Sequence, residues 1–226
     1  MSWMKRTFCS SIGLKMIMAV TGLALFLFLI AHLSGNLLTF AGAEAFNTYA
    51  AKLKSLGPLL WVARIGLLVV FATHVLTATM LTRKNRAARP QNYVFKDTIQ
   101  ASYASRTMMM SGVITLLFVL YHLAHFTFHW VGATDAEHFD YLGRHDAYQM
   151  LVLGFQNPVT SGLYVIAMLV LGMHLSHGLS SLFQSLGLNH PNFFPAIKKV
   201  APLLAWAIVI GFISIPVAVL AGMIAL

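Results

Sequence analysis

Acidic residues are scarce in this chain. It has six Asp and Glu among 226 residues, and all charged residues together make up 9%. A soluble domain carries about 25% charged residues. The chain is instead 58% hydrophobic, with a formal net charge of +9. Because the basic residues fall between long apolar runs, they indicate membrane orientation rather than nucleic-acid binding. We therefore predict a membrane protein with several spans.

Cysteine is nearly absent as well. Cys9 is the single cysteine, which excludes a disulfide within the chain and an iron–sulfur cluster held by its own thiolates. A cleavable signal peptide is also disfavoured. The first apolar run, from Met16 to Phe40, is longer than a signal core of about 7–15 residues. We expect this run to remain as a helix.

Five apolar segments are long enough to cross a membrane, which takes about 20 helical residues. They cover roughly residues 14–40, 58–82, 107–131, 158–183 and 202–224. The predicted fold is an all-α integral membrane bundle in which residues 1–226 form one transmembrane domain. Pro216 is expected to kink the last helix. The connections 41–57 and 132–157 are expected to form short helices at the membrane surface.

Charged residues divide between the two predicted sides. The N-terminal segment and the second and fourth connections hold most basic residues: Lys5, Arg6, Lys15, Arg83, Lys84, Arg86, Arg89, Lys96, Arg106, Lys198 and Lys199. The opposite side holds every acidic residue except Asp97: Glu44, Asp135, Glu137, Asp140 and Asp146. The positive-inside rule then places the N-terminus in the cytoplasm and the C-terminus outside.

Histidine is the polar residue that recurs inside the spans. The stretch ITLLFVLYHLAHFTFHW, residues 114–130, carries His122, His125 and His129, which share one face of a helix at about 100° per residue. The first, second and fourth spans carry His32, His74 and His174. An imidazole in a bilayer is costly and normally faces a protein interior or a cofactor.

These histidines separate by depth. With a rise of about 1.5 Å per residue, His32 and His122 fall in the outer half of the membrane, and His74 and His174 in the inner half. Two pairs at two depths predict two bis-histidine haems in a four-helix core. Such ligation leaves iron no open position, which suits electron transfer. A zinc site lacks buried carboxylates or thiolates. A haem-free transporter or proton channel along the histidine stripe stays open.

Further residues accompany the candidate ligands. Three of the histidines have a small residue one turn later that would leave room for a flat macrocycle, or equally for close helix packing: Gly35, Ala78 and Gly178. His125 and His177 follow a ligand by three residues and could contact haem propionates or a quinone, although packing explains them as well. His129 and His138 are expected near the outer surface.

Five stretches of the sequence are informative through their order and spacing. They are LFLFLIAHLSGN with His32, GAEAFNTYAAKLKSL, the second-span His74, ITLLFVLYH ending at His122, and GLYVIAMLVLGMHLSHGLSSL with His174. In order and spacing they resemble the diheme cytochrome b membrane subunit of succinate dehydrogenases and fumarate reductases. Because the matching stretch ends at His122, which is also nearest the bilayer interior, we predict His122 rather than His125 as the outer ligand.

The resemblance implies two haems b, the inner one held by His74 and His174 and the outer one by His32 and His122. It implies a flavoprotein and an iron–sulfur subunit on the cytoplasmic face of a bacterial cytoplasmic membrane. This chain would pass electrons between the iron–sulfur subunit and a quinone, with menaquinone favoured, in succinate oxidation or fumarate reduction. The dicarboxylate site would lie in a partner. A cytochrome b subunit of another quinone-linked dehydrogenase is the alternative, and the oligomeric state stays open.

Contacts to quinone or propionates are also expected. Candidates near the outer haem are Asn47, Tyr49, Trp61 and Arg64, and near the inner haem Ser10, Lys15 and Arg106. Arg64 would pair with a propionate, or else extend along the apolar surface. Some members of the resembled family have an acidic residue at the outer end of the second helix that handles quinone protons. This chain departs from that pattern, because the region reads LKSLGPLLWVAR and the nearest acid is Glu44.

Overall fold

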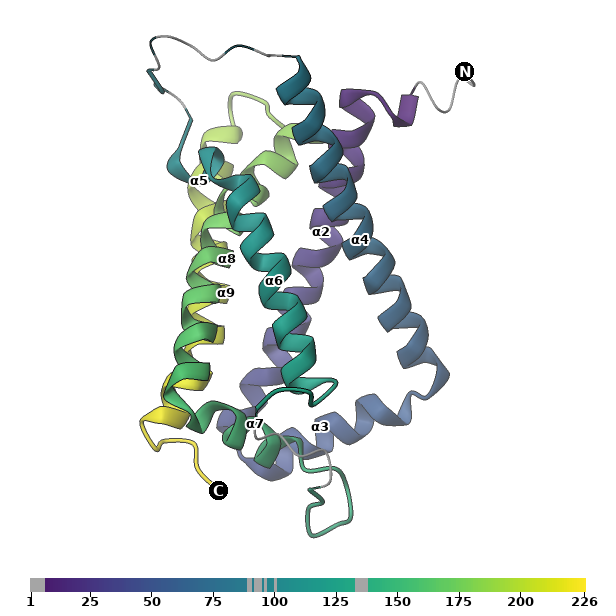
Figure 1. Cartoon of the computed structure of the whole chain (residues 1–226), viewed down its shortest axis with the longest axis vertical. Coiled ribbons are helices and arrows are strands. Elements are labelled where there is room, and N and C mark those ends of the chain that lie inside the picture. The colour runs from purple at the N-terminus through teal and green to yellow at the C-terminus, as the bar shows by residue number, and fades with distance from the viewer. Residues whose placement is uncertain (1–6, 89–90, 92–94, 96, 100, 133–137) are drawn as a thin grey trace.

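The computed structural model is a bundle of long helices (Figure 1). It describes residues 7–88, 91, 95, 97–99, 101–132 and 138–226. Within these residues, five helices are long and apolar enough to cross a membrane. They are α2 (Ser11–Leu37), α4 (Pro58–Ala87), α6 (Met108–Phe126), α8 (Pro158–Ser185) and α9 (Phe194–Leu220). The predicted all-α membrane bundle is confirmed. Six charged residues used to predict its orientation lie outside the described residues: Lys5, Arg6, Arg89, Lys96, Asp135 and Glu137.

Shorter helices join the spans. They are η1 (Leu38–Ala41), α3 (Ala43–Ser55), α5 (Tyr103–Arg106) and α7 (Ala147–Gln156). The helices α3 and α7 lie across the lower end of the bundle in Figure 1, as expected for the two outer connections. The α7 helix is capped by Asp146, whose carboxylate accepts a hydrogen bond from the Gln149 amide and so satisfies an otherwise unpaired donor of the first turn.

Several helix boundaries differ from the prediction. The α4 helix continues to Ala87 rather than ending near residue 82. The α6 helix ends at Phe126 rather than near residue 131, and His129 beyond it takes a left-handed φ of 55°. The prediction that His129 shares a helical face with His122 and His125 is therefore wrong. The α9 helix begins at Phe194 rather than near residue 202. A proline in its first turn is well tolerated there.

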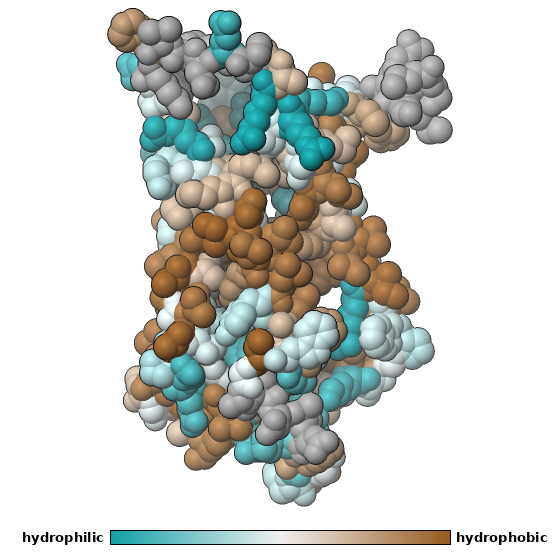
Figure 2. Space-filling model, in the orientation of Figure 1, coloured by the Kyte–Doolittle hydropathy of each residue, from teal (hydrophilic) through white to brown (hydrophobic). Residues whose placement is uncertain are grey.

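The long helices alternate in direction (Figure 1). One end of the bundle therefore collects the start of α2, the end of α4, the start of α6, the end of α8 and the start of α9. The surface in Figure 2 shows a hydrophobic band across the middle and hydrophilic residues towards both ends. This distribution fits a protein whose middle lies in lipid and whose ends meet water.

The spans pack in a definite order. The α2 helix contacts α4, α8 and α9, while α8 contacts α2, α6 and α9. The α4 helix packs mainly on α2 and leans away from α6 towards its lower end (Figure 1). The order around the bundle is α4, α2, α8, α6. The helices α4 and α8 thus form one diagonal of this core, and α2 and α6 form the other.

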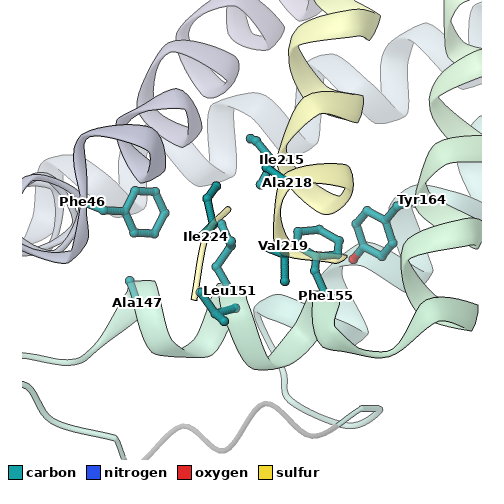
Figure 3. Close-up of a cluster of buried hydrophobic side chains, with 10 residues drawn as sticks. Phe46, Ala147, Leu151, Phe155, Tyr164, Ile215, Ala218, Val219 and Ile224 are labelled. Atoms are coloured by element: carbon teal, nitrogen blue, oxygen red, sulfur yellow. The ribbon is translucent and has the colours of Figure 1, made fainter. Parts of the chain in front are cut away.

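A buried apolar cluster joins the short helices to the lower end of the spans (Figure 3). It brings together side chains from α3, α7, α8, α9 and the C-terminal segment: Phe46, Ala147, Leu151, Val152, Phe155, Tyr164, Ile215, Ala218, Val219 and Ile224. Burial of these side chains fixes α3 and α7 against the spans. It also fixes the position of Tyr164, which belongs to the site described next.

Candidate functional site

The first histidine pair joins α2 and α6, which form one diagonal of the core. The ring centroids of His32 and His122 lie 5.9 Å apart, with an angle of 82° between the ring planes. Two imidazoles bound to opposite faces of one metal, with bonds of about 2 Å, have ring centroids about 6 Å apart. Aromatic rings surround the pair, with Phe28 and Phe212 beside His32 and Phe118 beside His122. The spacing and the apolar surroundings suit a shared metal.

The phenol of Tyr164 lies between two histidines of α6. Its oxygen is 3.3 Å from Nδ1 of His122 and 3.0 Å from Nδ1 of His125. His125 is buried, with 1% of its surface exposed, and its ring packs against Tyr121 and Phe126. The structure therefore brings His122 beside His32 and places His125 behind it, next to Tyr164.

The second pair lies on the other diagonal, with His74 on α4 and His174 on α8. Nδ1 of His74 lies 3.1 Å from the Thr21 hydroxyl of α2. Nδ1 of His174 lies 3.1 Å from the Ser111 hydroxyl of α6. Each inner histidine is thus held by a hydroxyl on a neighbouring helix.

These hydroxyls determine which ring nitrogen carries the proton. The Thr21 hydroxyl donates to the Ile17 carbonyl at 2.8 Å, and the Ser111 hydroxyl donates to the Met108 carbonyl at 3.1 Å. Because a hydroxyl has one hydrogen, a hydroxyl that donates to its carbonyl accepts a hydrogen bond from its histidine. Nδ1 is then protonated and the lone pair of Nε2 is available, which is the arrangement of metal-binding histidines.

A glycine follows each of these hydroxyl residues and lies against the same ring. A Cβ atom on Gly22 would stand 3.3 Å from Cε1 of His74, and one on Gly112 would stand 3.3 Å from Cε1 of His174. Thr21–Gly22 and Ser111–Gly112 therefore orient and seat the two inner rings in the same way. Neither dipeptide was among the residues predicted from the sequence.

The predicted clearance beside His32 is absent. A Cβ atom on Gly35 would lie 2.5 Å from the ring of Tyr49, so Tyr49 fills the space that was expected for a macrocycle. Gly178 has no other group within 4 Å of its Cβ position, and its predicted role stays a prediction. All four candidate ligands are partly exposed, whereas they were expected to be buried.

Comparison with known proteins identifies the family of this chain. A sequence profile described as the succinate dehydrogenase/fumarate reductase transmembrane subunit matches residues 82–219, more than half of the chain. The chain belongs to this family. It is 27% identical over 178 residues to the succinate dehydrogenase cytochrome b558 subunit of Bacillus subtilis (strain 168), a match that covers 72% of this chain and 73% of that protein. No solved structure matches significantly.

Family membership and five apolar spans make the chain a multi-pass membrane subunit of an oxidoreductase complex. The profile match contains His122 and His174, while His32 and His74 precede it. The structure brings His32 and His122 together, and the pairing of the four histidines as ligands stays a prediction.

Other candidate residues of the membrane subunit lie around its two ends. Arg64 and Trp61 are exposed on α4, where the guanidinium carbon of Arg64 lies 5.2 Å from the Trp61 ring centroid. At the opposite end Ser10 caps α2 by accepting from the Gly13 amide, Lys15 is exposed, and Arg106 donates to the Thr98 hydroxyl at 3.4 Å. His177 stays beside His174 on α8. The roles of these residues stay predictions.

Asn47 fastens α3 to α7. Its side-chain nitrogen donates to the Asp146 carboxylate at 2.9 Å, and its oxygen accepts from the Tyr148 amide at 2.9 Å. The side chain is 2% exposed, and a buried amide that makes these bonds holds its surroundings in place. The geometry therefore favours a structural role for Asn47 over the expected quinone contact.

Glu44, which lies on α3 with Asn47, takes part in an ionic cluster. The Arg144 guanidinium contacts Glu44 at 2.8 Å and Asp140 at 2.7 Å. Hydrogen bonds from Arg144, Tyr141 and Thr48 lower the pKa of Glu44 to about 2. Glu44 is therefore ionised at neutral pH, and it lies on α3 rather than on the second span.

Proposed function

We propose that this membrane subunit holds two bis-histidine haems b and passes electrons between an iron–sulfur subunit and a membrane quinone. The observation that carries the proposal is that His32 and His122 lie side by side on one diagonal of the helical core, with His74 and His174 on the helices of the other diagonal. His32 and His122 hold the outer haem, and His74 and His174 the inner haem. The relative named cytochrome b558 supports haem b as the cofactor.

The residues fit the cofactor. The centroid distance of 5.9 Å suits two imidazoles on one iron. The Thr21 and Ser111 hydroxyls leave Nε2 of each inner histidine available for iron. Haem supplies one-electron chemistry, and ligation by two histidines favours electron transfer because no iron position remains open. The protein's part is to hold the rings at fixed angles and keep the surroundings apolar.

The basic end of the bundle is the proposed docking side. The described basic residues there are Lys15, Arg83, Lys84, Arg86, Arg106, Lys198 and Lys199. By the positive-inside rule this end faces the cytoplasm of a bacterial cell, where a flavoprotein and an iron–sulfur subunit bind. Menaquinone is the proposed quinone, following the resemblance described above. Succinate oxidation and fumarate reduction would both use this path.

Haem content tests the proposal. The complex is purified through a tag on this chain, and haem b is measured as its pyridine haemochrome against the amount of the chain. Two haems b per copy are expected, together with a flavoprotein and an iron–sulfur subunit on a gel. A preparation without haem that conducts ions or protons in liposomes would instead favour a transporter. Nickel or molybdenum subunits would indicate another dehydrogenase.

Glu44→Gln is expected to leave the pH profile of quinone reduction unchanged between about pH 5 and pH 8. The ordinary glutamate pKa of about 4.3 is lowered to about 2 in the protein. The stabilisation from ionised Glu44 is therefore fully present above about pH 4.3 and is lost as the pH falls towards 2. The profile of the purified complex checks this, with Lys54→Gln as a control on the same helix. A shift of the pH profile in Glu44→Gln that is absent from Lys54→Gln would make Glu44 part of the proton path.

A further inference from the structure

His122 differs from the two inner histidines in what its Nδ1 atom contacts. The inner histidines face hydroxyls that already donate to backbone carbonyls. His122 instead faces the Tyr164 hydroxyl, which lies within hydrogen-bonding distance of His125 as well. Tyr164 is 6% exposed and His125 is 1% exposed. A buried phenol shared by two imidazoles is a specific arrangement that the proposed electron path leaves unexplained.

The number of hydrogens on each group determines the direction of the hydrogen bonds among His122, Tyr164 and His125. If His122 binds iron through Nε2, its Nδ1 carries a hydrogen and donates to the Tyr164 oxygen. The phenol has one hydrogen, which is then free to go to Nδ1 of His125. His125 must accept at Nδ1 and carry its own hydrogen on Nε2. The order of donation is His122 to Tyr164 to His125.

Surrounding rings keep the phenol in place. Tyr164 makes edge-to-face contacts with Phe118 at 5.1 Å and with Phe155 at 4.9 Å between ring centroids. Figure 3 shows Tyr164 beside Phe155 at the α8 side of the apolar cluster. Because packed aromatic rings resist displacement, the hydroxyl oxygen stays at a fixed place relative to His122.

We propose that Tyr164 and His125 form a positioning pair that orients His122 and strengthens its bond to the outer haem iron. This inference rests on the proposed function. A hydrogen-bond acceptor on Nδ1–H makes an imidazole a more basic ligand, and a phenol that is itself donating is a better acceptor than an isolated one. A more basic ligand favours oxidised iron, so the pair lowers the reduction potential of the outer haem relative to a site without it.

Tyr164→Phe in the intact complex tests the proposal. The variant keeps the ring and removes the acceptor. We expect two haems per chain, an upward shift of the outer haem's midpoint potential, a changed low-spin signal for that haem in electron paramagnetic resonance, and an unchanged inner haem. Potentiometric titration followed by optical spectra measures both haems. The haem that His32→Ala removes identifies the outer one.

Tyr121→Phe is the matched control. Tyr121 is on α6 with His122 and His125, and its ring touches those of His125 and Tyr164, so this variant removes a nearby phenol while retaining the Tyr164 bridge. Both potentials should then stay as in the native complex. The proposal is wrong if Tyr164→Phe keeps two haems with native potentials, or shifts only the inner haem.

Variants of His125 decide the matter if Tyr164→Phe does not assemble. His125→Leu removes the acceptor for the Tyr164 hydroxyl and should raise the outer potential. His125→Gln offers a side-chain oxygen in its place and should restore much of the native value. Equal potentials in these two variants would overturn the proposal. Failure of the proposed function is recognised separately, since the native complex would then lack two haems.

Discussion

His74→Ala is expected to remove the inner haem and leave the outer one, so that the purified complex holds one haem b per chain. The change deletes one of two iron ligands, and alanine offers no replacement. His174 would remain with its Nδ1 held by Ser111, but a single imidazole leaves the iron one protein ligand short. Pyridine haemochrome gives the amount of haem, and difference spectra identify the component that is lost.

His122→Ala is the complementary experiment and should remove the other spectral component. His190→Ala is the control, because His190 is exposed in the connection between α8 and α9 and stacks on Phe193. If both ligand variants keep two normal haem signals, the assignment is wrong. If His125→Ala loses the outer haem while His122→Ala retains it, His125 is the ligand and the two-haem core still holds.

The number of spans could be predicted because bilayer thickness fixes the length of an apolar helix. The ends of the helices were harder to predict from the sequence. The α6 helix ends at Phe126, and the left-handed backbone of His129 beyond it is uncommon for a residue with a side chain. The start of α9 was placed too late because Lys198 and Lys199 lower the hydropathy of a turn that is helical all the same.

The pairing of His32 with His122 could be predicted because depth follows from the rise per residue along a helix. The atoms around each ring could not, because they depend on how neighbouring helices are rotated about their axes. Gly35 illustrates this, since rotation places Tyr49 rather than open space against it. The family profile begins at residue 82, so it too says nothing about the placement of His32.

Dipeptides of a hydroxyl residue followed by glycine also show that contacts around the rings cannot be predicted from residue type. Thr21–Gly22 and Ser111–Gly112 hold the inner histidines. The dipeptide Ser34–Gly35 has the same two residue types. Its serine also donates to a carbonyl, that of Ile30, but its glycine faces Tyr49 rather than a histidine. Ser161–Gly162 likewise binds the Phe155 carbonyl. Residue type alone cannot distinguish the two dipeptides that touch a histidine from the two that do not.

Gly112→Val is expected to abolish most binding of the inner haem. The Cβ atom alone would stand 3.3 Å from Cε1 of His174, and valine adds two methyl groups that are stiff about χ1. The ring must turn or shift, which breaks its alignment with the iron and its hydrogen bond to Ser111. Gly112→Ala adds only the Cβ atom, and a movement of a few tenths of an ångström accommodates it, so this variant should retain two haems.

Gly22→Val should remove the same haem from the opposite side, because a Cβ atom there meets His74 at 3.3 Å. This outcome is informative because Gly22 and Gly112 lie on α2 and α6, the helices that carry the outer ligands. A general distortion of either helix would disturb the outer haem first. Gly66→Val on α4 is the control, since its Cβ position has no neighbour within 4 Å. Loss of different haems in the Gly22 and Gly112 variants would show that His74 and His174 do not share one iron.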